Sequence, residues 1–149
     1  MHWKAWALGF AFVAVGATMA AEVKVERLRV PGGARPHDVA PAPEPGGPVW
    51  YTAQGQGALG VPDPATGQTR QIPLGRGSAP HAEYVDRQDQ VWVSDFAANA
   101  MLCFDPRSER FQSFPSPQPD AAIRQILGRA GKVWAPESGT HHPVVYRTH

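Results

Sequence analysis

The sequence has little charge and almost no cysteine, and its many prolines leave little room for long helices. Charged residues make up 18% of the 149 residues, too few beside a 42% hydrophobic fraction for a disordered chain. Cys103 is the single cysteine and cannot form a disulfide within the chain. Glycine does not recur at every third position as collagen requires. The 16 prolines and 15 glycines instead predict a turn-rich, mostly β domain.

Residues 1–21 have the pattern of a secretory signal peptide. Lys4 precedes an uncharged run, and small residues at Thr18 and Ala20 stand where a signal peptidase reads the chain. An uncleaved membrane anchor is the alternative, but the apolar stretch is short for a bilayer span of about 20 residues. We therefore expect residues 1–20 to be removed, and residues 21–149 to form a periplasmic or secreted domain without a membrane partner.

The charge balance also bears on partners. Loss of Lys4 with the signal peptide leaves equal numbers of basic and acidic residues, spread along the chain. Nucleic-acid and anionic-membrane partners need a basic excess, so neither is expected. A small molecule or a peptide is the ligand class that remains.

The rest of the chain repeats every 42 residues. Val49-Trp50, Val91-Trp92 and Val133-Trp134 keep this spacing, as do Asp63-Pro64 and Asp105-Pro106. Repeats of about 40 to 50 residues made of short β segments are typical of propeller blades with four antiparallel strands. The repeated tryptophans and Cys103 are interpreted as packing residues of these strands, and the Asp-Pro pairs as type I turns.

The repeats predict an all-β fold of about three propeller blades, at residues 31–73, 74–115 and 116–149. The strands are expected at 36–39, 49–52, 58–61, 69–72, 80–85, 91–94, 100–104, 110–114, 124–127, 133–135 and 144–147. Residues 22–30 alternate apolar and charged side chains, and are expected to close the last blade as its fourth strand. Propellers typically have about four to eight blades, so the ring is incomplete, completed by oligomerisation, or shortened from a longer protein.

The repeat unit resembles that of the streptogramin B lyase family, also called virginiamycin B lyases. The resemblance rests on Pro80-His81, Val91-Trp92-Val93-Ser94-Asp95 and Asn99-Ala100-Met101. The first repeat keeps Pro36-His37 but has Ala53 at the acidic position, and the third keeps Trp134 and Glu137 without Pro-His. Full-length relatives resemble seven-bladed propellers of about twice this length. The chain looks like the two ends of such a protein, joined near residues 78–84.

The resemblance implies a carbon–oxygen lyase that opens a cyclic depsipeptide antibiotic by elimination, with Mg²⁺ as cofactor. It implies that His81 is the base, that His37 contacts the substrate, and that Asp95 and Glu137 hold the metal. Ala79 stands where the family has a metal-binding Glu, and Arg35 stands in the same place before His37. Two other interpretations remain open: a non-catalytic secreted propeller that binds a ligand or protein, and a degenerate remnant left by an internal deletion.

Each candidate residue also has a structural alternative. His37 and His81 would then hydrogen-bond at strand starts, and Asp95 and Glu137 would accept backbone N–H groups in turns. The C-terminal histidines, His141, His142 and His149, are not expected to form a metal site, because neighbours on a strand point to opposite faces. The hydroxyl residues have no His-Asp pattern around them, so nucleophilic hydrolysis has no support.

Overall fold

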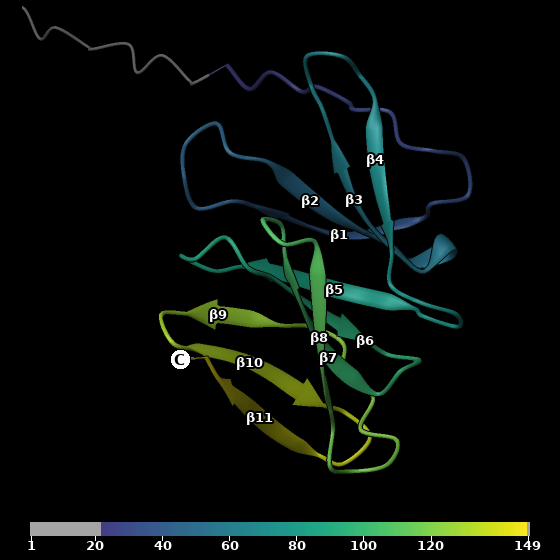
Figure 1. The fold of residues 1–149 in the computed structure, drawn as a ribbon, viewed down its shortest axis with the longest axis vertical. Coiled ribbons are helices and arrows are strands. Elements are labelled where there is room, and N and C mark those ends of the chain that lie inside the picture. The colour runs from purple at the N-terminus through teal and green to yellow at the C-terminus, as the bar shows by residue number, and fades with distance from the viewer. Residues whose placement is uncertain (1–21, 149) are drawn as a thin grey trace, which may run out of the picture.

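The structure, a computed structural model that describes residues 22–148, consists of three antiparallel sheets lying side by side (Figure 1). The first sheet has the order β1 (Pro36–Pro41), β2 (Val49–Ala53), β3 (Ala58–Pro62) and β4 (Thr69–Pro73). The second has the order β5 (Pro80–Val85), β6 (Val91–Asp95), β7 (Ala100–Asp105) and β8 (Arg110–Pro115). The third contains β9 (Leu127–Arg129), β10 (Lys132–Glu137) and β11 (His142–Arg147), with β10 in the middle. The predicted fold class is confirmed: the chain is all-β and forms part of a propeller.

The apolar character of the repeats follows from the stacking of the sheets. The second sheet lies between the other two, so β6 is buried along its whole length. Trp50 packs edge-on against Phe104 between the first and second sheets, with ring centroids 5.8 Å apart. Trp92 stacks on Phe114 at 5.6 Å between the second and third sheets. The predicted core role of these two tryptophans is confirmed, and Cys103 is buried beside Trp92.

Trp134 differs from its two repeat equivalents. It is 42% exposed, on the face of the third sheet that no other described sheet covers. Leu127, its partner in the β9–β10 ladder, is 77% exposed. The prediction that this tryptophan is a core residue is therefore wrong for residues 22–148, because the packing partner that the repeat supplies elsewhere is missing here.

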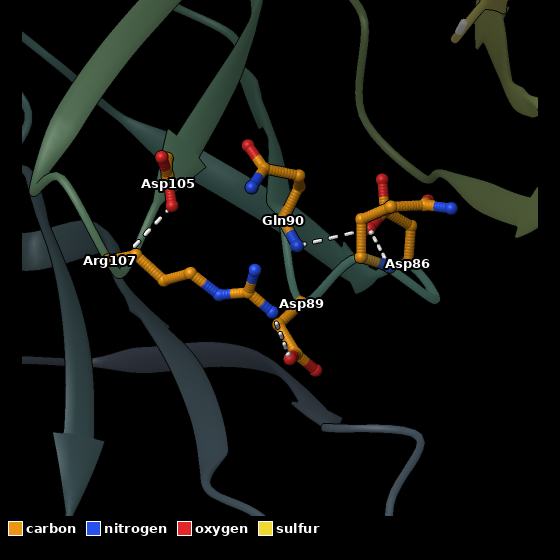
Figure 2. Close-up of polar contacts among 6 residues, drawn as sticks. Asp86, Asp89, Gln90, Asp105 and Arg107 are labelled. Atoms are coloured by element: carbon orange, nitrogen blue, oxygen red, sulfur yellow. Dashed lines mark hydrogen bonds and ion pairs between the residues drawn. The ribbon is translucent and has the colours of Figure 1, made fainter.

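The Asp-Pro turns form as predicted. Asp63 accepts bonds from the backbone N–H of Ala65 at 2.9 Å and from the Thr66 hydroxyl at 2.8 Å. Asp105 repeats this pattern, and Figure 2 shows its 2.9 Å bond from the Arg107 backbone N–H. These bonds stabilise the ionised carboxylate and lower the pKa of both aspartates.

Two predicted strands differ from the structure. Residues 22–30 form no strand, and the hydroxyl of Thr69 on β4 donates to the carbonyl of Arg29 at 3.4 Å, so this segment runs past the first sheet (Figure 1). Val23 and Val25 remain 82% and 76% exposed, so they bury too little apolar surface to order a ladder. The third sheet is left with three strands, and β11 has a free edge.

The inner strand of the third repeat is also displaced. The strand predicted at 124–127 begins instead at Leu127, and Ile123 makes only an isolated bridge with Glu137. Ile123 and Ile126 are buried in the core between the second and third sheets. The packing of these two side chains in the core therefore fixes the path of this segment, which makes fewer ladder hydrogen bonds than a regular strand.

Some predictions cannot be compared with the structure. The signal peptide predicted at residues 1–20 and His149 lie outside the described residues. Within residues 22–148 no helix has the length and apolar character needed to cross a membrane.

Candidate functional site

The structure brings His37 and His81 together. Each is the second residue of its strand, β1 or β5, and these are the inner strands of adjacent sheets. Their ring centroids are 3.8 Å apart. Each strand has an irregular register at this point, between Pro36 and Val39 and between Pro80 and Glu83. A bulge bends a strand and redirects a side chain, so the repeated bulge accounts for the meeting of the two rings.

Hydroxyl groups that repeat at 42 residues hold the inner strands in place. The buried hydroxyl of Thr52 accepts from the backbone N–H of Asp38 at 3.1 Å and donates to the carbonyl of His81 at 3.1 Å. Ser94 accepts from the N–H of Ala82 at 3.0 Å and donates to the carbonyl of Arg124. Thr52 thus links β1 to β5, and Ser94 links β5 to the segment that precedes β9.

Arg124 takes the place in the third sheet that His81 has in the second, because Ser94 binds its carbonyl as Thr52 binds that of His81. Its guanidinium lies 4.5 Å from the centroid of the Phe96 ring, a cation–π contact. The first two inner strands therefore present imidazoles, and the segment before β9 presents a positive charge. The third repeat has no Pro-His, and an arginine fills the position.

His81 is set up to be uncharged at neutral pH. It is 8% exposed, and burial is the main cause that lowers its pKa, with repulsion by His37 and Arg124 adding to it. Asp38 and a contact with Gln125 oppose the shift. Its Nδ1 is buried and has no hydrogen-bond partner among the described residues. A neutral imidazole can accept a proton at its unprotonated ring nitrogen. The buried Nδ1 is out of reach of a bound molecule, so this role falls to Nε2.

Glu83, which sequence reasoning missed, lies two residues after His81 on β5. It is 5% exposed, and neither carboxyl oxygen has a hydrogen-bond partner among the described residues. Burial raises its pKa to about 8, helped by the negative charge of Asp38 and weakly opposed by Thr52 and Ala40. A glutamate in a β strand usually faces water, and nothing in the 42-residue pattern marked this one as buried.

Asp95 is a structural anchor. Its Oδ1 accepts from the backbone N–H groups of Ala79, Ala97 and Ala98 at 3.0–3.1 Å, and its Oδ2 accepts from the Ser78 hydroxyl. Asp95 is 1% exposed and pairs with Pro80, the residue before His81, in the β5–β6 ladder. Its carboxylate thus fastens the loop before β5 to the loop after β6.

Glu137 has the corresponding role in the third sheet. Its two oxygens accept from the hydroxyls of Ser116 at 2.7 Å and Thr140 at 2.9 Å. Mg²⁺ needs several free oxygen ligands, whereas both predicted carboxylates are already occupied. Nor do residues 22–148 contain a group of three His, Cys, Asp or Glu residues placed to hold a metal ion. The described residues do not fit Mg²⁺, and Mg²⁺ binding stays a prediction of the resemblance.

Removal of the Asp95 carboxylate tests this structural role. Asp95→Ala is expected to lower the free energy of unfolding by about 2–4 kcal/mol, because several charge-assisted bonds are lost in a buried place. Addition of Mg²⁺ or a chelator is expected to leave the wild-type melting temperature unchanged. Glu44→Ala is the control, since Glu44 is exposed and its side chain makes no hydrogen bond or ion pair among the described residues. Stabilisation by Mg²⁺ that is lost in Asp95→Ala would instead identify a metal site.

A hollow lies at the other end of the blades, away from the two histidines. It has a volume of about 590 Å³, and Trp92, Cys103, Phe114 and Tyr146 form its apolar part. Asp86, which lines the hollow, accepts from the Trp92 indole N–H at 2.8 Å. It also accepts from the backbone N–H of Gln90 at 3.0 Å (Figure 2). Burial raises the pKa of Cys103 to about 12, so the thiol is unreactive. The His37–His81 pair is therefore the chemically better equipped site.

The remaining predicted histidines lie away from this pair. His141 is in the turn between β10 and β11, with a left-handed φ of 62°, and His142 is exposed at the start of β11. Neither belongs to a group of metal-ligating residues within the described part of the chain.

The search against family models and the search of curated proteins found no match. Among solved structures, virginiamycin B lyase from Staphylococcus aureus is similar with a TM-score of 0.69 and 19% identity, over 85% of this chain and 46% of that chain. A streptogramin B lyase structure gives 0.64 and 16%, over 77% and 41%. The extracellular domain of a one-component system from B. thetaiotaomicron gives 0.53 and 17%, over 74% and 16%.

These similarities confirm the resemblance at the level of the fold. Solved structures of streptogramin and virginiamycin B lyases share the arrangement of the sheets, at less than 20% sequence identity. The chain spans less than half the length of either lyase.

Proposed function

We propose that this chain is a virginiamycin B lyase-like protein that opens a cyclic depsipeptide by elimination at the His37–His81 pair. The observation that carries the proposal is the pair itself: two imidazoles in contact at the bulged starts of adjacent inner strands. The similarity of the fold to virginiamycin B lyase supports it. A further solved structure, a catalytically inactive variant of that lyase with quinupristin, is also similar, with a TM-score of 0.67 and 18% identity.

In this proposal His81 is the general base. Its neutral ring takes a proton from a carbon next to a carbonyl group, the released electron pair forms a carbon–carbon double bond, and the ester carboxylate leaves. No water is consumed, so the open product is an isomer of the ring. His37, which is exposed beside His81, contacts the substrate, and Arg124 places a positive charge near the developing anion.

The described inner strands line only part of a propeller centre. We therefore place the rest of the substrate contacts on further blades, which a second copy of the chain would supply by completing the ring. Some similar structures are extracellular domains, which supports action outside the cytoplasm.

The test is incubation of the purified protein with a streptogramin B antibiotic, with and without Mg²⁺, followed by chromatography and mass spectrometry. An eliminated product has the mass of the ring but a new retention time, whereas a hydrolysed product gains one water. His81→Ala is expected to lower kcat by about 100-fold or more, and His37→Ala mainly to raise KM. His142→Ala is the control at an exposed histidine.

Full turnover in His81→Ala would contradict the assignment of the base. No linear product at any protein concentration would contradict the lyase itself. Calorimetry with the same cyclic peptide then separates a non-catalytic binding propeller from a chain that does not bind this ligand.

A further inference from the structure

The third sheet leaves one face and one edge uncovered. Trp134 and Leu127, which pair across β9 and β10, lie on the face that no other described sheet covers. Within residues 22–148 no strand pairs with the outer edge of β11, although β4 and β8 hold this place in the other two sheets (Figure 1). An unpaired edge presents backbone N–H and C=O groups on which another strand can form a ladder. The third sheet can therefore take a fourth strand and a covering sheet.

The first sheet carries the complementary surface. Each core between two sheets contains the second-strand tryptophan of one sheet and the second-strand valine of the next: Trp50 with Val91, and Trp92 with Val133. Val49 is the equivalent valine of the first sheet by the 42-residue repeat, and it is 39% exposed, whereas the other two are fully buried. Trp134 and Val49 are therefore the two halves of a contact that the chain already makes twice.

Residues 26–31 have the features of the missing fourth strand. Pro31 keeps the 42-residue spacing of the prolines that end β4 and β8. The residue before each of these prolines is apolar and packs in a core that contains the next sheet of the chain: Val30 with the first sheet, Ile72 with the second and Phe114 with the third. The segment thus lies beside the first sheet as a fourth strand would, but without a sheet to belong to.

We propose that residues 26–31 of a second copy of this chain complete the third sheet, pairing antiparallel with β11. In the same interface, the face that contains Trp134 and Leu127 packs on the exposed Val49 and Val39 of that copy. The occupant is another copy because the third sheet and the first sheet carry the two sides of the interface that joins the sheets within the chain.

The strand has to come from another molecule. Ala34 is buried against the first sheet, where its carbonyl accepts from Gly55 at 2.9 Å, and its own N–H donates to the carbonyl of Pro31 at 3.1 Å. These contacts hold residues 31–34 at the first sheet, and the second sheet separates it from the third. Packed sheets lie about 10 Å apart, so the third sheet is about 20 Å away. Consecutive Cα atoms are only about 3.8 Å apart, so Val30 cannot reach β11 of its own chain.

The repeat sets the register of the new strand pair. β10 and β11 pair in the register that a shift of 42 residues gives from β6 and β7. With residues 26–31 in the place of β8, and Pro31 in the place of Pro115, the β7–β8 ladder puts Leu28 opposite Val145. Val145 pairs in turn with Trp134, so Leu28 lies on the face that includes this tryptophan. Leu28 is 52% exposed in its own molecule and extends the apolar face of the third sheet when it pairs.

The charges support this register. Glu26 lies opposite Arg147, and the equivalent pair between β7 and β8, Asp105 and Arg110, also has opposite charges. Opposite charges at directly opposed positions stabilise a strand pair, whereas like charges destabilise it. In its own molecule Glu26 contacts Lys24, in an exposed ion pair that contributes little to stability. Its carboxylate is therefore available to Arg147.

The same register fits the hollow between the second and third sheets. Arg27 lies opposite Tyr146, and Tyr146 lines the hollow together with Asp86. The Tyr146 hydroxyl is buried and has no hydrogen-bond partner among the described residues. A guanidinium at this place supplies a donor to the hydroxyl and a positive charge beside the acid.

Sedimentation of the purified protein without substrate tests the association. The average mass is expected to rise above that of one chain as the concentration increases. Leu28→Asp is expected to raise the dissociation constant about tenfold or more, because it removes apolar burial and places a charge in the interface. Val23→Asp is the matched control, since Val23 is also exposed but its position lies beyond the end of β11. The mass of one chain at every concentration, or equal effects of the two substitutions, would overturn the proposal.

A disulfide between copies tests the register. Opposed residues of antiparallel strands have Cα atoms about 4.5–5.5 Å apart, within the range for a disulfide. Leu28→Cys combined with Val145→Cys is therefore expected to give covalently linked copies under mild oxidation. Leu28→Cys combined with Pro143→Cys is the control, because a diagonal pair is about 7–8 Å apart. The buried Cys103 thiol is not expected to take part.

A disulfide that forms within one chain would show that the segment reaches its own β11, and would overturn the proposal. Equal linkage in the two double variants would overturn it as well. The inference goes beyond the proposed function, since both measurements are made without substrate. Association and linkage in a protein that gives no streptogramin product would contradict the lyase alone.

Discussion

Replacement of Trp92 by alanine is expected to lower the free energy of unfolding by about 3–5 kcal/mol, the usual cost of removing a large buried aromatic side chain. Trp92 is 6% exposed, stacks on Phe114, and donates its indole N–H to Asp86 at 2.8 Å. The substitution leaves a cavity in the core between two sheets and removes one hydrogen-bond donor from the buried Asp86 carboxylate. The loss therefore combines a cavity with a broken hydrogen bond.

The chain carries its own controls for this prediction. Trp50→Ala is expected to cost a similar amount, because Trp50 is 5% exposed in the other core. Trp134→Ala is expected to cost about 1 kcal/mol or less, since Trp134 already has much of its surface in water.

The measurement is urea unfolding at two protein concentrations. It is followed by far-ultraviolet circular dichroism, because tryptophan fluorescence changes with the substitution itself. Equal costs at Trp92 and Trp134 would contradict the prediction. A cost at Trp134 that grows with protein concentration would show that a second molecule covers this face in solution.

The free energy of unfolding is expected to fall by about 2 kcal/mol as the pH rises from 6.5 to 8, because of Glu83. The folded chain keeps the Glu83 proton up to a pKa of about 8, whereas the unfolded chain releases it near 4.5. The folded state binds more protons between these values, so stability decreases with rising pH in this window and levels off above 8.

The pH range is chosen to isolate Glu83. His81 has a lowered pKa in the folded chain, so its contribution rises with pH only up to its ordinary value of 6.5. Asp63 and Asp105, whose pKa values are lowered, contribute only at acid pH. Between pH 6.5 and 8, Glu83 is therefore the shifted group that changes its proton.

Glu83→Gln is the test of this pH dependence, because glutamine keeps the shape and carries no titrating proton. We expect its unfolding free energy to be nearly flat from pH 6.5 to 8, and to exceed that of the wild type at pH 9. Urea titrations at a series of pH values give both quantities, with Glu44→Gln as the exposed control. A wild-type profile that is flat in this range would contradict the burial of an unpaired carboxyl group.

The sequence predicted the fold well because its signals were local and repeated. Each Val-Trp pair lies on the second strand of a sheet, and each Asp-Pro turn forms where its spacing indicated. The hydroxyl residue two places after Trp50 and Trp92 belongs to the same repeat motif, but its structural role was not predicted. Thr52 and Ser94 keep the same 42-residue spacing, and both tie adjacent sheets together.

The remaining features depend on contacts between segments far apart in the chain. The alternation in residues 22–30 predicts a strand, but a strand needs a partner strand. This segment instead meets the first sheet through the Thr69 hydroxyl and through the packing of Val30. The resemblance assigned His37 and His81 to one substrate, but the contact of their rings was not predicted, because it depends on the irregular register of two strands. Glu83 was missed because its burial is set by the neighbouring sheet.

The open faces at the two ends of the stack give the molecule a polarity. One end presents Leu127 and Trp134, whereas the other presents Val39 and Val49 beside the chain that leads into β1. Because the two surfaces differ, copies that meet through them join head to tail. The rotation between successive copies then decides the product: a rotation that divides a full turn closes a ring, and any other continues into a filament.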